Sequence, residues 1–421
     1  MNKIFINALL IFSLLILFFA LVGCGASGPA IEDPFNANLP LLPPTTPEED
    51  FVRFQNNCVK NVEKQVNNLS NGGEKLCLEA QNGFSGLEYT IELFNYNPIG
   101  IENHFQGIVR KGGYIYLSGS DQNSGQARIW VGQVSGYKEE NQVLSSNIKS
   151  ENSSINYYNY NTDDKIIKGI NVTIEPSWHV GGLSLLGDLL AVPVEEYRES
   201  EGYDLYSSVL FFDVRDSANP RLIKKANILS RPGRDAGSSF LHRLADGRFI
   251  VGLGTTHINN NYLDIYVSKT TNIQDGFQEQ PLPIPQVELS NIVRSQGMGM
   301  VVDCDTKENY LIVTDTEGGG TITRDGIYSA TNLLRLYKLT FHKENPDIDN
   351  SPIVRVHSED RGQKMLEVIN INAYSHFAAA AGIVTNKNNE LLILASNHYR
   401  FYNLRAPTKR IIKVKEYRGS L

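Results

Sequence analysis

The same order of short segments recurs five times between residue 104 and the C-terminus. Each unit opens with a run rich in small residues, turns at glycine, asparagine or aspartate, continues in an unbroken apolar run and ends in a more alternating run. The units begin near residues 104, 179, 238, 297 and 376. Apolar runs of this length without helical periodicity predict β-strands, and repeats of this period predict a stacked or radial architecture.

Each unit is typical of one blade of a β-propeller, because inner strands crowd around a channel while middle strands are covered on both faces. We therefore expect an all-β chain in which residues 85–421 form a five-bladed β-propeller. Residues 87–94 alternate apolar and polar side chains, and we expect this strand to complete the last blade. A pair of β-sandwiches is the alternative architecture.

The first 24 residues have the layout of an export signal. Lys3 is the only charge before Cys24, and an apolar run occupies residues 4–22. The run ends in Leu-Val-Gly-Cys at residues 21–24, which resembles the lipobox of bacterial lipoproteins. The resemblance implies cleavage after Gly23, a lipid on Cys24 and a membrane as partner. A plain membrane anchor is the alternative, because about 20 apolar residues can span a bilayer.

The residues after the signal predict a tether rather than a folded domain. Gly25, not aspartate, follows the cysteine, and by analogy with lipoprotein sorting in double-membrane bacteria this favours the outer membrane. We expect residues 1–23 to be the signal peptide and residues 24–50, which contain six prolines, to be an extended spacer. Without Lys3 the chain has 38 basic against 46 acidic side chains, a net charge of −8, so nucleic acid is not an expected partner.

Four cysteines occur, at positions 24, 58, 77 and 304. Export implies an oxidising compartment in which disulfides persist. Cys58 and Cys77 bracket a polar stretch, and we expect residues 51–84 to form a small helical cap closed by a Cys58–Cys77 disulfide, with two free thiols as the alternative. Cys304 ends an apolar run and is expected to be a buried strand residue.

The second unit resembles a known propeller repeat. It reads His-x-Gly-Gly-Leu from residue 179, Gly-Asp-Leu-Leu-Ala-Val-Pro from 187, and Leu-Phe-Phe-Asp-Val-Arg-Asp-Ser-Ala-Asn-Pro from 210. Together these segments resemble the LVIVD-type repeat, although Arg215 and Ser217 depart from its usual serine and proline. The resemblance covers about residues 179–225. It implies an exported or surface propeller and implies no activity.

The candidate site residues are histidines. His104, His179 and His376 each open an inner strand, so a propeller brings them to one face of its channel, and Arg294 enters the same region. Converging imidazoles can bind a metal or an anionic ligand, or each can cap its own blade. These four residues are our ligand-binding candidates, and no cofactor is expected.

One further motif has two interpretations. Asp303, Asp305 and Asn309 are spaced as in part of a calcium loop, but the central glycine and terminal glutamate are missing. A polar hairpin turn is the simpler interpretation.

The sequence contains no nucleophile elbow, zinc-protease motif, phosphate loop or dinucleotide fingerprint. We therefore expect a tethered binding or scaffold module for a protein or cell-envelope ligand, without enzymatic activity. The alternative is a periplasmic propeller enzyme, a hydrolase or an oxidoreductase, with its site at the channel mouth around His179. Mouths of closed β folds are the default binding sites, and propellers host both classes of protein.

Overall fold

The computed structural model describes most of the chain after residue 54. Cys24, His104, Arg294 and residues 87–94 lie outside the described residues. The expectations that concern Cys24, His104 and Arg294 therefore remain predictions. The described residues are 31–32, 55–81, 105–121, 126–134, 137–138, 143–144, 164–196, 206–254, 263–282, 295–322, 328–343, 354–370, 375–397, 401–403 and 406–421. Among them, no helix has both the length and the apolar character needed to cross a membrane.

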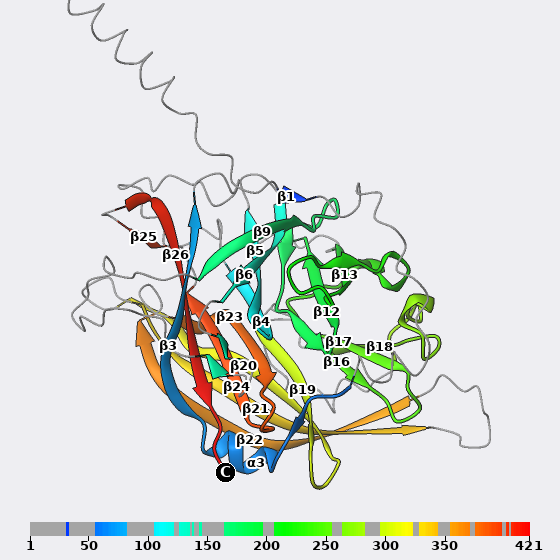
Figure 1. Ribbon diagram of the computed structural model, residues 1–421. Coiled ribbons are helices and arrows are strands. Elements are labelled where there is room, and N and C mark those ends of the chain that lie inside the picture. Colours follow the sequence, from blue (N-terminus) through cyan, green and yellow to red (C-terminus); the bar gives the residue numbers. More distant parts are fainter. Residues whose placement is uncertain are drawn as a thin grey trace, which may run out of the picture.

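The chain is a β-propeller, in which antiparallel units follow one another around a common centre (Figure 1). We name these units blades one to five. Blade one contains β4 (Phe105–Lys111), β5 (Tyr114–Asp121), β6 (Gln126–Gln133) and β9 (Lys165–Asn171). Blade two contains β10 (His179–Val180), β11 (Ser184–Leu186), β12 (Leu189–Glu195), β13 (Tyr206–Asp213), β14 (Arg221–Leu222) and β15 (Ile228–Pro232).

The remaining blades have the same strand order from the centre outward. Blade three contains β16 (Ser238–Arg243), β17 (Phe249–Gly254) and β18 (Leu263–Val267). Blade four contains β19 (Gly297–Asp303), β20 (Asn309–Ile322), β21 (Tyr328–Lys343) and β22 (Val354–Asn370). Blade five contains β23 (Ser375–Thr385), β24 (Leu391–Asn397), β26 (Ala406–Arg418) and, from the N-terminal side, β3 (Ser70–Gln81), with the short β25 (Phe401–Asn403) beside β26.

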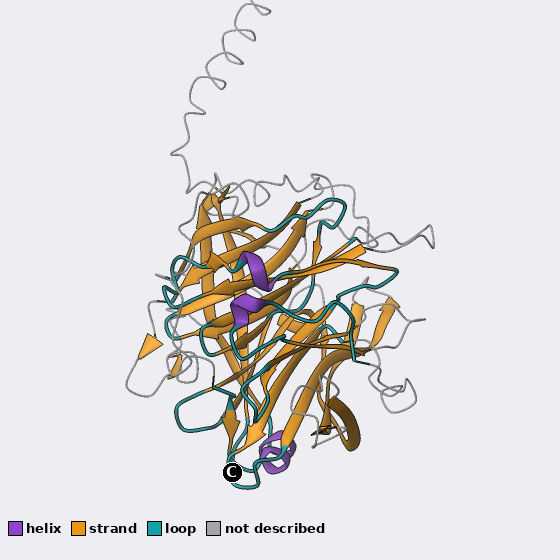
Figure 2. Ribbon diagram, turned by 90° about the vertical axis from the view of Figure 1, so that its right-hand side faces the viewer, coloured by secondary structure: helices purple, strands orange, loops and turns teal. Residues whose placement is uncertain are grey.

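The other described elements are short. They are β1 (Ile31–Glu32) beside β9, β2 (Cys58–Val59) beside β19, the pair β7 (Tyr137–Lys138) and β8 (Val143–Leu144), helix α3 (Val62–Asn67), and the 3-10 turns η1 (Lys224–Ala226) and η2 (Ile273–Asp275). Figure 2 shows how little helix lies among the strands.

The outermost strand of blade five corrects two of our expectations. β26 pairs with β3 from Arg418 opposite Ser70 to Lys409 opposite Gln81, so β3 occupies the edge that we assigned to residues 87–94. Residues 51–84 are therefore not a helical cap, and the propeller includes residues before 85. We took the Asn71-Gly72-Gly73 sequence as a breaker, but register shifts between Val414 and Tyr417 accommodate it within the ladder.

Five apolar clusters hold the blades together, one at each interface between neighbours. Alternate side chains of each middle strand face opposite neighbours, as the period of a β-strand requires. In blade one, Tyr116 packs toward blade two with Leu190, whereas Leu117 packs toward blade five with Leu394. The interfaces two–three, three–four and four–five contain equivalent clusters. Apolar burial on both faces of each blade explains the unbroken apolar runs of the sequence.

The inner strands approach one another backbone to backbone. A Cβ on Gly382 would lie 1.5 Å from the carbonyl oxygen of Ile108, and one on Gly182 would lie 2.5 Å from the carbonyl oxygen of Gln296. Glycine is the residue that permits such an approach. Gly182 of blade two approaches Gln296, which precedes the first strand of blade four. Backbone atoms therefore narrow the central channel where Gly182 lies.

The inner strands run in the same direction. β23 pairs in parallel with β4, and Gly182 bridges in parallel to Ser238 of β16. We call the end of the channel at which these strands begin the start end. The opposite end is the strap end, named after the segment described next.

Residues 55–69, which we name the strap, cross the strap end. The Asn56 side chain bonds both backbone groups of Arg243 in blade three, at 2.7 Å each. β2 pairs with β19 of blade four, and the Gln65 side chain accepts a bond from Leu391 N of blade five at 2.7 Å. The Asn57 side chain also donates to the carbonyl of Leu185 in blade two at 3.4 Å, so one short segment binds four blades at a single end of the channel.

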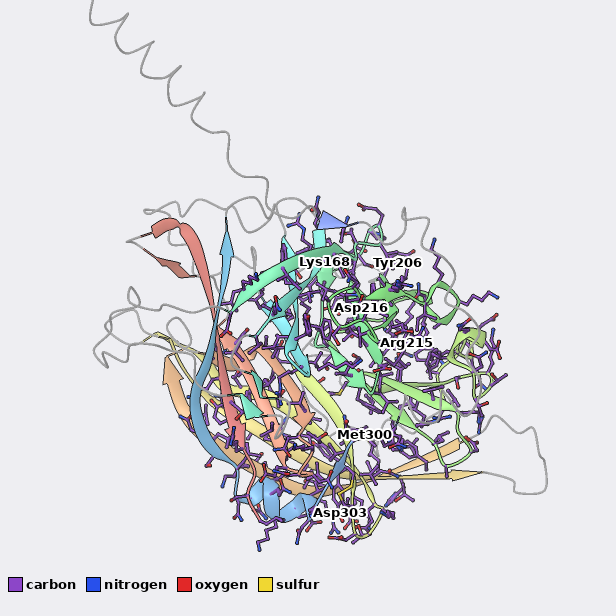
Figure 3. All side chains as sticks on the ribbon, viewed as in Figure 1. Lys168, Tyr206, Arg215, Asp216, Met300 and Asp303 are labelled. Carbon is purple, nitrogen blue, oxygen red and sulfur yellow. A yellow bond between two sulfur atoms is a disulfide. The ribbon has the colours of Figure 1, made fainter. Side chains whose placement is uncertain are left out.

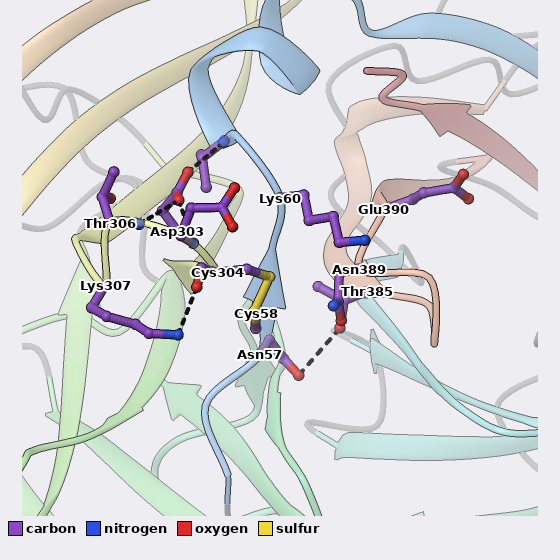
Figure 4. Close-up of a disulfide and its surroundings, with 12 residues drawn as sticks. Asn57, Cys58, Lys60, Asp303, Cys304, Thr306, Lys307, Thr385, Asn389 and Glu390 are labelled. Carbon is purple, nitrogen blue, oxygen red and sulfur yellow. Dashed lines mark hydrogen bonds between the residues drawn. A yellow bond between two sulfur atoms is a disulfide. The ribbon is translucent and has the colours of Figure 1, made fainter.

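A disulfide fixes the strap to blade four. Cys58 is bonded to Cys304, which directly follows β19 (Figure 4). The predicted Cys58–Cys77 bond is therefore wrong, and Cys304 is a half-buried turn residue rather than a buried strand residue. Spacing misled the prediction because β3 carries Cys77 into blade five, whereas β2 places Cys58 against the end of β19.

The neighbouring motif is a turn and not a calcium loop. Asp303 Oδ1 accepts the N–H groups of Asp305 and Thr306 at 2.9 and 3.0 Å, and Oδ2 accepts the N–H of Val62 at 2.9 Å. The carboxylate thus faces backbone donors, which confirms the polar-turn interpretation.

Candidate functional site

The two ends of the channel differ in what covers them. The strap and its disulfide cover the strap end, whereas the start end carries buried polar side chains. Blade two supplies the main residues of the start end. In Figure 3 blade two can be found by the labels Tyr206 and Asp216, and blade four by the labels Met300 and Asp303. The start end is therefore where we look for a site.

A buried carboxylate lies at the start end. Glu195, the last residue of β12, is fully buried and stands opposite His179, the first residue of β10. His179 Nδ1 lies 3.0 Å from Glu195 Oε1, and the N–H of Ala236, on the segment before β16, donates to Glu195 Oε2 at 2.5 Å. His179 is itself only 2% exposed. Blades two and three thus hold one carboxylate between two donors.

A third blade completes this cluster. The side-chain Nε2 of Gln106, on β4 of blade one, lies 3.1 Å from His179 Nε2, and Gln106 is 6% exposed. The imidazole therefore bridges an amide of one blade and a carboxylate of another. We name Gln106, His179, Glu195 and the Ala236 N–H the start-end cluster.

The inner strands depart from regular pairing beside this cluster. Gln106 is the extra residue of a β-bulge, because Phe105 pairs with Gly119 while Gly107 pairs with the adjacent Ser118. In blade two, the inner strand is interrupted between β10 and β11, and in blade five the register shifts between His376 and Ala380. Bulges that redirect side chains are typical of functional sites.

An arginine network adjoins the cluster in blades two and three. Arg231 donates to Asp264 Oδ2 at 2.5 Å, to the Tyr266 hydroxyl at 3.0 Å and to the carbonyl of Asp235 at 2.9 Å. Burial alone would lower the pKa of Arg231, but Tyr266 and Asp264 hold it above its ordinary value. Asp235 precedes Ala236, so this network positions the backbone that donates to Glu195.

The structure places the predicted site residues as follows. His179 and His376 lie at the same end of the channel, and both are buried, at 2% exposure each. His104 and Arg294 lie outside the described residues. No described group of three His, Cys, Asp or Glu side chains is arranged to hold a metal ion. The structure thus brings His179 and His376 to one end of the channel and gives His179 a carboxylate partner.

Sequence reasoning missed Glu195 and Gln106. Glu195 ends the apolar run Leu-Leu-Ala-Val-Pro-Val. The end of a middle strand lies opposite the start of an inner strand, so a charged residue there could have indicated a partner for His179. Gln106 gave no such signal, since its orientation depends on a bulge.

The LVIVD-like segment has a structural role. Lys111 of blade one pairs with Asp188 and donates to the carbonyl of Val214 at 2.7 Å. Asp216 accepts from Ala218 N at 3.2 Å and from the Asn219 side chain at 2.9 Å, which shapes the turn after β13. These residues join blades one and two and lie outside the start-end cluster.

No protein-family model matches the chain, and no curated protein matches it either. Several solved structures align with it. The xylan β-1,4-xylosidase of Bacillus halodurans C-125 aligns with a TM-score of 0.37 and 13% identity, over 76% of this chain and 54% of that chain. An exo-1,5-α-L-arabinanase from a bovine ruminal metagenomic library aligns with a TM-score of 0.37 and 11% identity, over 74% and 93%. Trypanosoma rangeli sialidase aligns with a TM-score of 0.35 and 12% identity, over 73% and 44%.

These comparisons correct our expectation about function. We expected a binding or scaffold module, but the aligned structures carry the names of enzymes. The chain spans about half the length of the xylosidase. Because all three TM-scores lie below 0.5, the choice of reaction and of residues rests on this chain alone.

Proposed function

We propose that the protein is a hydrolase whose site is the start-end cluster, with Glu195 as its acid–base group. The observation that carries this proposal is the burial of the Glu195 carboxylate between His179 and the Ala236 N–H, at the end opposite the strap. A buried carboxylate is costly unless it is hydrogen-bonded. Carboxylates in such surroundings are typical acid–base groups of enzymes.

The cluster suits hydrolysis because that reaction needs only proton transfer and positioning. One group takes a proton from water, and a second gives a proton to the leaving group. Glu195 is suited to the first role. Asp235, which is 1% exposed and precedes Ala236, is the second carboxyl-bearing residue beside the cluster. A pair of carboxyl groups is the equipment with which most glycosidic bonds are hydrolysed.

We further propose that the five blades close into one ring, in which β3 completes blade five. The pairing of β23 with β4 and the apolar cluster between blades five and one support this closure.

For the location, we propose a lipoprotein tethered through Cys24, with the signal removed after Gly23. The Leu-Val-Gly-Cys sequence and the proline-rich segment that follows support this proposal, and Gly25 favours the outer membrane. The membrane is then its partner through the lipid. Replacing Cys24 with alanine should abolish incorporation of a labelled acyl chain, and normal incorporation would reject the tether.

An activity screen tests the proposed hydrolase. The purified full chain is incubated with a panel of chromogenic glycosides, which come first because the enzymes named above act on carbohydrates, and then with carboxylic esters. We expect turnover of a member of the panel, and loss of that turnover in Glu195→Gln. Turnover that Glu195→Gln leaves unchanged, or no turnover on either panel, rejects the proposal.

A further inference from the structure

The start-end cluster contains a hydrogen bond that restricts the protonation of His179. Gln106 Nε2 is a side-chain NH2 group, which can only donate. With the amide in this orientation its NH2 group lies 3.1 Å from His179 Nε2, and we assign that ring nitrogen as the acceptor. An imidazole nitrogen that accepts carries no proton, and the single proton of the neutral ring then resides on Nδ1.

The other side of the ring agrees with this assignment. His179 Nδ1 lies 3.0 Å from Glu195 Oε1, so the Nδ1–H donates to a carboxylate oxygen. The second oxygen of Glu195 accepts the Ala236 N–H at 2.5 Å. Both carboxylate oxygens therefore receive donors, which favours the ionised form of Glu195.

The described elements packed around the ring contribute further polar and charged groups. β5 contributes hydroxyls, and Ser120 Oγ accepts the N–H of Val180 at 2.9 Å. Arg128 of β6 lies over Trp130, which belongs to the core between blades one and five, and so it is on the other face of blade one. Asp235 precedes the donor Ala236, and its carbonyl is engaged by Arg231. Among the described residues, Glu195 is the carboxylate that pairs with His179.

We propose that Gln106 is the positioning residue of this site: it holds His179 as the neutral Nδ1–H tautomer and thereby keeps Glu195 ionised and oriented. The bulge in β4 is what directs this side chain at blade two. A side chain of blade one thus determines the protonation state of the His179–Glu195 pair in blade two. The role of Glu195 as a base rests on the proposed function, whereas the state of His179 does not.

Nitrogen-15 NMR of histidine-labelled full chain tests this inference without any substrate. The chain has 8 histidines, and the His179→Asn variant identifies the signals of this ring. At neutral pH we expect a protonated Nδ1 and an unprotonated Nε2 for His179. A protonated Nε2, either alone or together with Nδ1, would overturn the proposal.

Two variants separate positioning from a purely structural role. In Gln106→Glu a carboxylate replaces the donor, so Nε2 should gain a proton and the ring should become imidazolium at neutral pH. In Gln106→Leu the donor is lost, and the Nε2–H tautomer should appear. If both variants fold and leave the His179 signals unchanged, Gln106 does not set its protonation.

The outcomes for function and for positioning are distinguishable. If the screen finds no hydrolysis but His179 shows the expected tautomer, the proposed function fails and the hydrogen-bond assignment stands. If hydrolysis depends on Glu195 but His179 is imidazolium in the unmodified chain, the function stands and this inference fails.

Discussion

Single glycines at the centre determine whether the blades can meet. Gly382 has the closest approach, because a Cβ there would lie 1.5 Å from Ile108 O, and backbone cannot move aside as a side chain can. We expect Gly382→Ala to lower the free energy of unfolding by about 3 kcal/mol, near the upper range for overpacking. Thermal unfolding followed by circular dichroism measures this loss.

Gly233→Ala is the matched control for that variant. Gly233 has a φ of +69°, but nothing lies within 4 Å of a Cβ built there. Only the left-handed backbone opposes alanine, at a cost of about 1 kcal/mol. Equal losses in the two variants would show that the inner strands do not pack as described.

Asp303 makes the attachment of the strap depend on pH. Burial would raise the pKa of its carboxyl, but the N–H groups of Thr306, Val62 and Asp305 together hold that pKa below its ordinary value. The stabilisation is therefore complete above the ordinary carboxyl pKa of about 4, and it is lost as the pH falls through the lowered value.

Asp303→Asn should accordingly destabilise the protein by about 1 kcal/mol at neutral pH, comparable to the loss of a helix cap. The difference from the unmodified chain should shrink as the pH falls from the ordinary carboxyl pKa of about 4 through the lowered pKa of Asp303, because the protonated carboxyl also loses its acceptor strength. Urea unfolding at neutral and at acidic pH measures this difference in the free energy of unfolding, and Asp305→Asn, at an exposed position, is the control. A difference that is constant with pH contradicts the assignment.

At the scale of elements, β3 is the strand on which closure depends. A chain that begins at Gly83 lacks both the strap and β3. The loss of β3 leaves the edge of β26 unpaired, and exposed edges of this kind promote association, whereas loss of the disulfide alone does not. We expect that chain to aggregate or to melt far below one that begins at Gln55, as size-exclusion chromatography and thermal unfolding would show. If the two chains are equally stable monomers, β3 does not close the last blade.

The strap can be released separately from β3. The Cys58–Cys304 disulfide joins residues 246 positions apart, and the chain-entropy model assigns such a bond roughly 5 kcal/mol. The double replacement Cys58→Ser and Cys304→Ser should therefore lower thermal stability while leaving the protein monomeric. Peptide mapping without reduction should recover the Cys58–Cys304 pair, and a Cys58–Cys77 pair would contradict the structure.

These elements also mark the limit of what the sequence could predict. The apolar middle strands and small-residue inner strands were predictable, because burial on both faces leaves a pattern in consecutive residues. The disulfide partner of Cys58 and the identity of the closing strand were not, because both depend on pairing between distant segments. Residues 87–94 have the stronger strand pattern, yet the Gly-containing β3 pairs with β26.

For the whole molecule, the strap makes the two ends of the propeller unequal. It contacts blades two to five at one end, while the buried cluster of Glu195, His179 and Gln106 lies at the other. The sequence placed His179 at the start of an inner strand, and the structure has it there. The carboxylate at its centre required the register between β10 and β12.

The most direct test of this account compares two carboxylates at opposite ends of the channel. Glu308, at the strap end of blade four, pairs with Lys338, and its glutamine variant is the control for Glu195→Gln. On a substrate found by the screen, Glu195→Gln should lower kcat/KM by about 100-fold or more, the usual contribution of an acid–base group. Glu308→Gln should leave kcat/KM within about twofold of the unmodified chain, since it lies outside the site that we assign to acid–base catalysis. Equal effects of the two variants, in proteins of matched thermal stability, would contradict a site at the start end.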